Sequence, residues 1–263
     1  MIVDCFIFNN EVDLLDIRLQ TMDPFVDRFV IVECGETFQG KTKLLNFELN
    51  KSRFKRFLHK IIYVHIPYFP VSVTGLGDRF MDPWEYEYQA REAIQIALRR
   101  NSPDDWVLIS DVDEIPDMRK WDEKSEGLFE CYQHYYYLNY RDPKYVMAAP
   151  VIVKMSTVHR IGSIQTLRRT RGDFLPRIPY PSGWHYSCMG PAEAISQKLK
   201  EFSHAEYNTS YWTSVDRIRQ CMETGRDLLE RDWLHKYEKV LVDLTFPPCV
   251  YDNPEKYAHL IKI

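Results

Sequence analysis

The first 110 residues alternate between two hydrophobic patterns. Short apolar runs rich in β-branched side chains predict strands, and they lie at 2–8, 28–33, 60–65 and 106–110. Between them, apolar residues recur at helical spacing and predict helices at 11–20, 46–58 and 84–100. Strands that alternate with helices indicate βαβ units with right-handed crossovers. We therefore expect an α/β fold of Rossmann-like type, with a mostly parallel central sheet flanked by helices.

After residue 116 the pattern changes. Segments 128–140 and 149–158 predict further strands that extend or flank the sheet. A basic, proline-rich stretch at 168–181 predicts a loop, and segments 192–202 and 214–229 predict helices. The sequence has no internal repeat, low-complexity tract or interdomain linker. We therefore expect one domain over residues 1–263.

Composition excludes several classes of protein. With 34 basic and 38 acidic residues the formal charge is -4, whereas dedicated nucleic-acid binders carry a strongly basic face. No segment approaches the ~20 apolar residues of a membrane span, which leaves peripheral membrane contact open. The first residues lack a basic region and soon reach Asp4, so we expect no signal peptide. Six single cysteines without a C-x-x-C pair indicate reduced thiols and a cytoplasmic protein, and nothing predicts its oligomeric state.

The segment SDVDEIP at 110–116 is the most informative for chemistry. It follows an apolar run at 107–109, which places it at the carboxyl end of a strand, where open α/β sheets bind ligands. Residues i and i+2 of an extended chain point to the same side, so Asp111 and Asp113 should converge. Two converging carboxylates repel each other unless a cation lies between them, and Mg²⁺ or Mn²⁺ favours carboxylate and phosphate oxygens. A divalent metal site is therefore predicted, although such acid pairs are often only solvated loop residues.

Several segments together resemble glycosyltransferase family 17. They are DCFxFNxExDLLxIR at 4–18, FVIVE at 29–33, TFxGK at 37–41, WExExQ at 84–89, DxDEIP at 111–116, GWHxS at 183–187 and FSHxEYN at 202–208. The resemblance extends over nearly the whole chain in the expected order. It departs at 90–92, where Ala-Arg-Glu replaces a Gln-Arg-Asn run, and the membrane anchor of the animal Golgi enzymes is lacking. The chain is therefore more similar to a bacterial or viral member.

The resemblance implies a GT-A fold and a metal-dependent, inverting glycosyltransferase. Its expected cofactor is Mn²⁺ or Mg²⁺, and its expected partners are a UDP-sugar donor, with UDP-N-acetylglucosamine first, and a glycan acceptor. Residues 1–117 would form the nucleotide-sugar-binding half and residues 118–263 the acceptor-side half. Without an export signal, the expected acceptor is an intracellular glycan or a lipid-linked intermediate.

The resemblance also implies roles for individual residues. Asp111 and Asp113 are the expected metal ligands, with His185 or His204 as a third, because GT-A enzymes often use a histidine. Inversion needs a base that deprotonates the acceptor hydroxyl. The first candidate is Glu193, near the start of a predicted helix, where an acid also complements the helix dipole. Asp113 is the second catalytic carboxylate, and the rival bases are Glu206 and Asp117.

Donor contacts are expected from four groups of residues. The diphosphate would meet arginines of the basic loop, namely Arg168, Arg169, Arg171 and Arg177. Two residues on the helix before the acidic segment, Gln89 and Arg91, would reach the nucleotide. Uracil or ribose would lie at the ends of the first two strands, near Phe8, Asn9 and Glu33. Aromatic stacking is expected from Trp84, Trp184 and the tyrosines at 135–137, and the loop at 66–83 would close over the donor or simply connect two elements.

Two other functions fit parts of the sequence. Phosphatases of the haloacid dehalogenase type also carry a D-x-D after a strand, but normally after the first one. A non-catalytic protein that binds a sugar nucleotide or a glycan on the same fold is the third reading.

Overall fold

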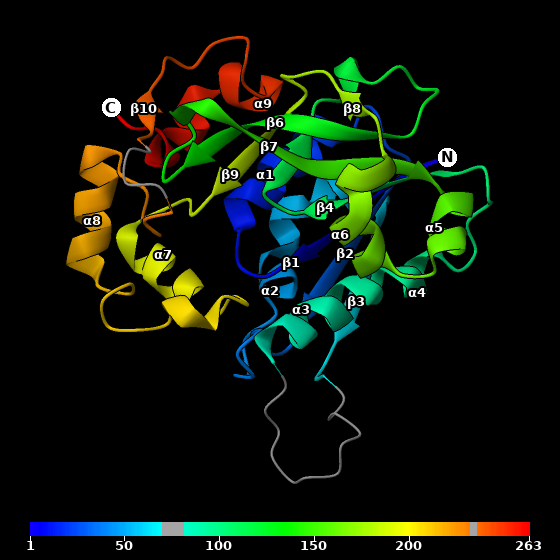
Figure 1. The fold of residues 1–263 in the computed structure, drawn as a ribbon, viewed down its shortest axis with the longest axis horizontal. Coiled ribbons are helices and arrows are strands. Elements are labelled where there is room, and N and C mark those ends of the chain that lie inside the picture. The colour runs from blue at the N-terminus through cyan, green and yellow to red at the C-terminus, as the bar shows by residue number, and fades with distance from the viewer. Residues whose placement is uncertain (70–81, 232–235) are drawn as a thin grey trace, which may run out of the picture.

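The structure is a computed structural model that describes residues 1–69, 82–231 and 236–263. The described strands form one ten-stranded sheet (Figure 1). Its first part is parallel, in the order β3 (Ile61–Ile66), β2 (Arg28–Cys34), β1 (Ile2–Phe8), β4 (Trp106–Asp111). These are the four strands that the sequence predicts, and the Rossmann-like α/β arrangement expected of a GT-A-type fold is confirmed.

The second part of the sheet is largely antiparallel. The long β7 (Tyr140–Lys154) pairs with β4 on one side and with β6 (Gly127–Tyr135) on the other. Next to β6 lies β9 (Gly183–Ser187), and the short β5 (Glu114–Pro116) pairs with β9 at the edge. Two-residue strands β8 (Arg177–Ile178) and β10 (Glu238–Lys239) pair with β6 and β7. Because β4 pairs directly with β7, the sheet is continuous across residue 117.

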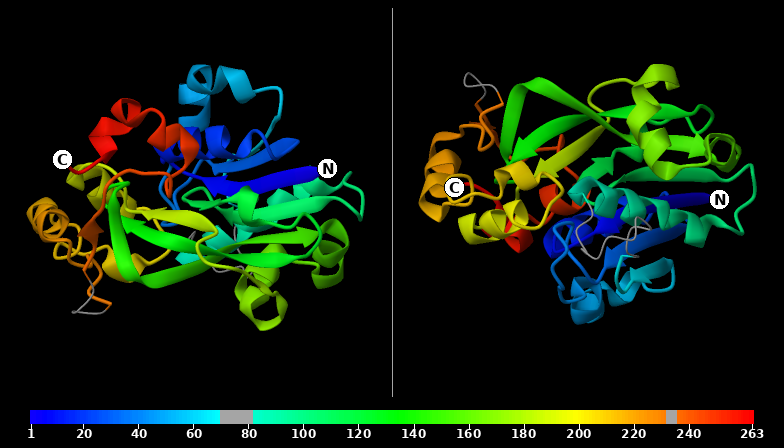
Figure 2. Two further views of the ribbon diagram at one scale, coloured as in Figure 1. Left: turned by 90° about the horizontal axis from the view of Figure 1, so that it is seen from above. Right: turned by 60° about the horizontal axis from the view of Figure 1, so that its bottom comes forward.

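Helices cover both faces of the sheet (Figure 2). The α-helices are α1 (Val12–Met22), α2 (Asn46–Asn50), α3 (Pro83–Glu92), α4 (Ile94–Leu98), α5 (Met155–Ile161), α6 (Ile164–Phe174), α7 (Ala192–Leu199), α8 (Val215–Thr224) and α9 (Pro248–Tyr251). Short 3₁₀ segments are η1 (Lys51–Phe57), η2 (Met118–Lys120), η3 (Ala205–Tyr207) and η4 (Pro254–Leu260). None of the helices in the described ranges is long and apolar enough to span a bilayer.

The predicted basic loop at 168–181 is wrong in its first part, because residues 164–174 form α6. Ser163 caps this helix by accepting a hydrogen bond from the backbone N–H of Thr166. Ile164 and Leu167 pack into the core on the inner face of the helix. Arg168, Arg169 and Arg171 are thereby held on a rigid element.

Alternate residues of the central strands belong to two separate cores. Val3 and Cys5 of β1 pack against α4, α5 and α6, whereas Phe6 and Phe8 pack on the opposite face against α1. This period of two is what a strand buried on both faces requires. Packing on both faces thus fixes the positions of these strands. Because they are parallel, their carboxyl ends lie together at one edge of the sheet.

Gly183 lies where β9 passes very close to β5 and β6. A Cβ at this position would meet the carbonyl oxygen of Ile115 at 2.6 Å and the Cys131 sulfur at 2.7 Å. We expect Gly183→Ala to lower the free energy of unfolding by roughly 1–3 kcal/mol, because a backbone atom cannot move aside. Urea unfolding would measure the change. Gly172→Ala is the matched control: nothing lies within 4 Å of its added methyl group, so this helical site should be stabilised. Equal effects at both positions would contradict the steric explanation.

Candidate functional site

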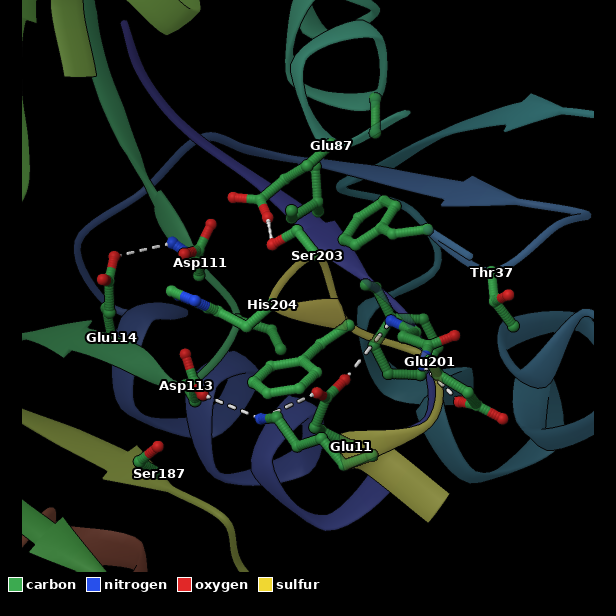
Figure 3. A pocket seen from close by; sticks show the side chains of 18 of the residues that line it. Glu11, Thr37, Glu87, Asp111, Asp113, Glu114, Ser187, Glu201, Ser203 and His204 are labelled. Atoms are coloured by element: carbon green, nitrogen blue, oxygen red, sulfur yellow. Dashed lines mark hydrogen bonds and ion pairs between the residues drawn. The ribbon is translucent and has the colours of Figure 1, made fainter. Parts of the chain in front are cut away.

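A pocket lies at the carboxyl ends of β1, β2 and β4. Its volume is about 320 Å³, and its wall also takes residues from α3, α6, β9 and the segment after α7. Figure 3 shows Asp111, Asp113 and Glu114 on one side of this pocket and Glu201 and Thr37 on the other. The pocket thus lies where the sheet topology predicts a ligand site.

A buried arginine fixes the backbone of the acidic segment. Arg18, on α1, is fully buried and binds both carboxylate oxygens of Asp4, at 2.9 and 2.5 Å. The same guanidinium donates to the carbonyl oxygens of Asp111 and Glu114, each at 2.8 Å, and to the hydroxyl of Ser110 at 2.7 Å. The turn between β4 and β5 is therefore held through its main chain by Arg18, and the carboxylate of Glu114 adds a hydrogen bond from the backbone N–H of Asp111 at 2.8 Å.

The carboxylate of Asp111 is occupied by two arginines. Arg91, on α3, donates to both of its oxygens at 3.1 and 3.0 Å, and Arg168 donates to one of them at 2.7 Å. Arg168 also binds both oxygens of Glu114 at 2.7 Å. Burial alone would raise the pKa of Asp111, but the charges of Arg168 and Arg91 outweigh it and hold this pKa well below its usual range. The expectation that Asp111 is a metal ligand does not fit this geometry.

Asp113 faces a lysine and a histidine instead. One of its oxygens lies 3.3 Å from the Lys198 amine, which also lies 3.3 Å from a carboxylate oxygen of Glu11. The other oxygen lies 3.9 Å from Nε2 of His185. Burial is the largest influence on Asp113 and raises its pKa, although Lys198 and His185 oppose it. Asp113 is therefore the acid of the pair that no arginine neutralises.

Asp113 and His185 fit one divalent cation between them. Nδ1 of His185 lies 2.7 Å from the side-chain oxygen of Gln133, and a hydrogen bond to that acceptor leaves the Nε2 lone pair facing Asp113. Within the described ranges, no three His, Cys, Asp or Glu side chains gather closely enough to enclose a metal ion. The protein would thus supply two ligands to the cation. Water or substrate oxygens would supply the remaining ligands, which is common at Mg²⁺ and Mn²⁺ sites.

Comparison with known proteins decides the family. The profile of glycosyltransferase family 17 matches residues 1–260. The chain belongs to this family. The resemblance that the sequence motifs indicated is thereby confirmed.

Among curated proteins, the chain is similar to the β-1,4-mannosyl-glycoprotein 4-β-N-acetylglucosaminyltransferases of Rattus norvegicus and Homo sapiens. Each is 32% identical over 118 residues, which is 44% of this chain. The match spans only 21% of the rat protein and 22% of the human one. Among solved structures, the mannosyltransferase PcManGT of Pyrobaculum calidifontis, in complex with GDP-Man and Mn²⁺, aligns over 86% of this chain and 76% of its own, with 12% identity and a TM-score of 0.41.

Several residues that the sequence suggested do line the pocket. Phe8 is the last residue of β1, and Asn9 follows it. Trp84 and Arg91 lie on α3, and Arg168 lies on α6. Tyr135, the first tyrosine of the 135–137 run, lines it as well. His204 lies at the wall, where it contacts Glu206 at 2.7 Å and packs edge-on against Trp84, so the structure gives it an aromatic environment and no acidic partner in the D-x-D turn.

Other predicted residues lie elsewhere, each for a clear physical reason. Glu193 is exposed and pairs with Arg219, so it does not line the pocket and is not retained as the base. Glu33 is buried and accepts hydrogen bonds from the backbone N–H groups of Asn46 and Phe47, which caps α2. Trp184 is a core residue because β9 alternates: His185 faces the pocket, whereas Trp184 donates its indole N–H to the carbonyl oxygen of Thr245 on the other side.

The remaining candidates also miss the pocket. Gln89 binds Glu85 along the exposed side of α3, and Arg171 binds the backbone of Ala148 and lies behind Arg168. The rival base Asp117 caps η2 and pairs with Arg119. Part of the predicted closing loop, residues 70–81, lies outside the described residues.

Three residues at the pocket were missed by the sequence reasoning. Lys198 and Glu201 lie at the end of α7 and just after it, at the opposite end of that helix from Glu193. Glu11 immediately precedes α1 and belongs to the first family motif. Its carboxylate accepts from the backbone N–H groups of Asn9 and Asn10, and this turn aims it at Lys198. A single charged residue next to a helix end carries no sequence signal for this role.

Proposed function

We propose that this protein is a metal-dependent, inverting glycosyltransferase that transfers N-acetylglucosamine from UDP-N-acetylglucosamine to a glycan hydroxyl. The observation that carries the proposal is the pair of Asp113 and His185, which faces a pocket at the carboxyl edge of the sheet in a chain of family 17. The related animal enzymes carry this sugar transfer in their names. The match covers only part of those proteins, so we propose no acceptor more specific than a glycan.

The charge of the pocket supports a requirement for a divalent cation. Seven carboxylates and five cationic side chains line it, an excess of two negative charges with the histidines neutral. A nucleoside diphosphate is itself an anion and would be repelled by such a wall. A divalent cation bound by Asp113 and His185 would supply the missing positive charge and stabilise the departing diphosphate. Lys198 would then assist by donating to a phosphate oxygen.

Glu201 is the best-placed base for the acceptor hydroxyl. It lines the pocket across from Asp113 in Figure 3, and the hydrogen bonds to its carboxylate come from the neutral amides of Asn9 and Gln197. The carboxylates of Asp111, Glu114 and Glu11, by contrast, are each held by an arginine or a lysine. Inversion requires deprotonation on the face opposite the leaving group, and a base across the pocket from the metal ligands satisfies this.

A phosphatase of the haloacid dehalogenase type is disfavoured by the same geometry. In that class the first aspartate of the motif attacks phosphorus and needs a free oxygen. Both oxygens of Asp111 are engaged by Arg91 and Arg168. A non-catalytic binding protein would not need a base facing the metal ligands, which Glu201 provides.

A donor-by-metal thermal-shift panel tests the proposal. At a donor concentration about a hundred times its Kd, UDP-N-acetylglucosamine with Mn²⁺ should raise Tm by roughly 5–10 °C. Omission of the metal should remove most of the shift, because the pocket carries excess negative charge. UDP release in the presence of an acceptor would then establish turnover. If no UDP-sugar shifts Tm with or without a divalent cation, the proposed function is wrong.

A further inference from the structure

Aromatic rings form a continuous series from the pocket wall out to the surface. Trp84 and His204 both line the pocket, and their ring centres lie 4.6 Å apart. His204 lies 5.8 Å from Tyr207, which lies 5.1 Å from Trp212, and Trp212 lies 5.0 Å from Tyr211. We name these five residues the aromatic series. It follows the segment between α7 and α8, which in Figure 1 runs from beside α3 out to α8.

The two ends of the series are open to solvent although both side chains are held in place. Trp84 is 46% exposed and Tyr211 is 54% exposed. The hydroxyl of Tyr211 donates to Glu230 at 2.8 Å, and the guanidinium of Arg217 lies 4.4 Å from its ring centre. A large exposed ring on a surface gains little for stability, so the contacts that immobilise Tyr211 call for another explanation. An ordered ring can bind a ligand with little further loss of side-chain entropy.

The two middle rings, Tyr207 and Trp212, are held in place by packing against the core. Tyr207 and Trp212 are half-buried and pack against a core cluster built from α7 and α8. Arg217 lies over Trp212 as well, at 4.6 Å, so one guanidinium packs against both Tyr211 and Trp212. The rings therefore form one rigid surface whose inner side is core and whose outer side is accessible.

Polar groups accompany the rings along the whole path. Glu206 lies beside His204, and Asn208 donates from its side-chain amide to Gln39. Thr209 and Ser210 are exposed next to Tyr211. Aromatic faces flanked by hydroxyl, amide and carboxylate groups match a sugar chain, because a pyranose has an apolar C–H face and a rim of hydroxyls. A hydrophobic protein segment would cover the exposed Thr209 and Ser210 without offering their hydroxyl groups a hydrogen-bond partner.

We propose that the aromatic series is an extended binding site for the acceptor, which is an oligosaccharide chain whose successive rings lie along it from the pocket outward. This inference rests on the proposed function and adds to it that the acceptor is a chain of several sugars. Tyr211 is then a specificity-determining residue: it contacts a sugar well away from the transferred group and discriminates long acceptors from short ones.

The test uses the full-length chain and measures Kd for chito-oligosaccharides from chitobiose to chitohexaose, with UDP and Mn²⁺ present. Wild-type protein should bind chitohexaose more tightly than chitobiose. Tyr211→Ala should weaken binding of chitohexaose roughly three- to tenfold and leave chitobiose unchanged. Tyr251→Ala is the matched control, because Tyr251 is also an exposed tyrosine, on α9, and does not line the pocket. A parallel series of mannose oligosaccharides distinguishes the kind of sugar.

The outcomes separate this inference from the proposed function. If wild-type protein shows no donor-dependent shift in Tm, the proposed function itself fails. If the donor binds but the affinity of wild-type protein for both series is independent of length, or if Tyr211→Ala and Tyr251→Ala behave alike, the extended site is wrong. A donor-induced shift retained in Tyr211→Ala shows that the variant is folded, so its loss of affinity cannot come from unfolding.

Discussion

Asp113→Asn is expected to reduce kcat/KM for sugar transfer roughly 10²- to 10³-fold, the usual effect of removing one electrostatic contact from a transition state. Asparagine has nearly the same shape, so the change removes the negative charge that faces His185 and Lys198 and little else. Without that charge the cation would be held weakly, and the departing diphosphate would lose its main support. Steady-state UDP release at several Mn²⁺ concentrations would measure the effect.

The proposed metal site gives a more specific form of this prediction. Part of the loss in Asp113→Asn should be recovered at high Mn²⁺, because the other proposed ligand, His185, would still bind the ion weakly. Asp216→Asn is the control, since Asp216 is an exposed aspartate on α8 that pairs only with Arg219 among the contacts found. Full activity of Asp113→Asn would show that the turn is not the metal site.

Arg18→Met is expected to destabilise the protein by roughly 3–5 kcal/mol, as when one partner of a buried ion pair is removed. The change leaves the Asp4 carboxylate buried without its partner and leaves the carbonyl oxygens of Asp111 and Glu114 without a donor. Urea unfolding would measure the loss. Methionine keeps most of the side-chain volume, so a cavity contributes little to the effect.

Two further variants separate charge from backbone support. Asp4→Leu combined with Arg18→Met should recover part of the lost stability, since an apolar pair can replace a buried ion pair, but the two carbonyl oxygens stay unpaired. Arg53→Met removes an arginine whose partner, Asp13, is near the surface, and should cost no more than about 1 kcal/mol. A loss in Arg18→Met as small as that in Arg53→Met would mean that the buried pair does not hold the turn.

The parallel half of the fold could be predicted from periodicity because β1, β2 and β4 are buried on both faces and helices separate its strands along the chain. The prediction was wrong where tertiary packing decides between helix and loop. Residues 168–174 have the basic composition of a loop, yet the serine cap at Ser163 and the spacing of Ile164 and Leu167 make them helical. The long β7 was only partly anticipated, since its middle residues are neither clearly apolar nor alternating.

For the pocket, the sequence located the acidic segment but not the neighbours that divide its roles. Asp111 and Asp113 look equivalent in sequence, and only the positions of Arg91, Arg168 and Lys198 distinguish the neutralised acid from the one that faces His185. Glu193 could be proposed because a helix start is visible in sequence, whereas Glu201 was missed because the direction of a side chain at a helix end is not. Contacts between residues far apart in the chain carry no local pattern.

The way Arg18 holds the turn has a consequence for substitutions within it. Apart from its bonds to Asp4 and Ser110, Arg18 donates to main-chain carbonyl groups of the turn, which every amino acid possesses. Substitutions at 112 or 113 therefore leave the bonds from Arg18 in place, and the Asp113 carboxylate can be replaced without loss of this support. Arg18 and Asp4 themselves have no such freedom. We therefore expect a variant that lacks the Asp113 carboxylate to keep the backbone of the turn, provided that it keeps Arg18 and Asp4.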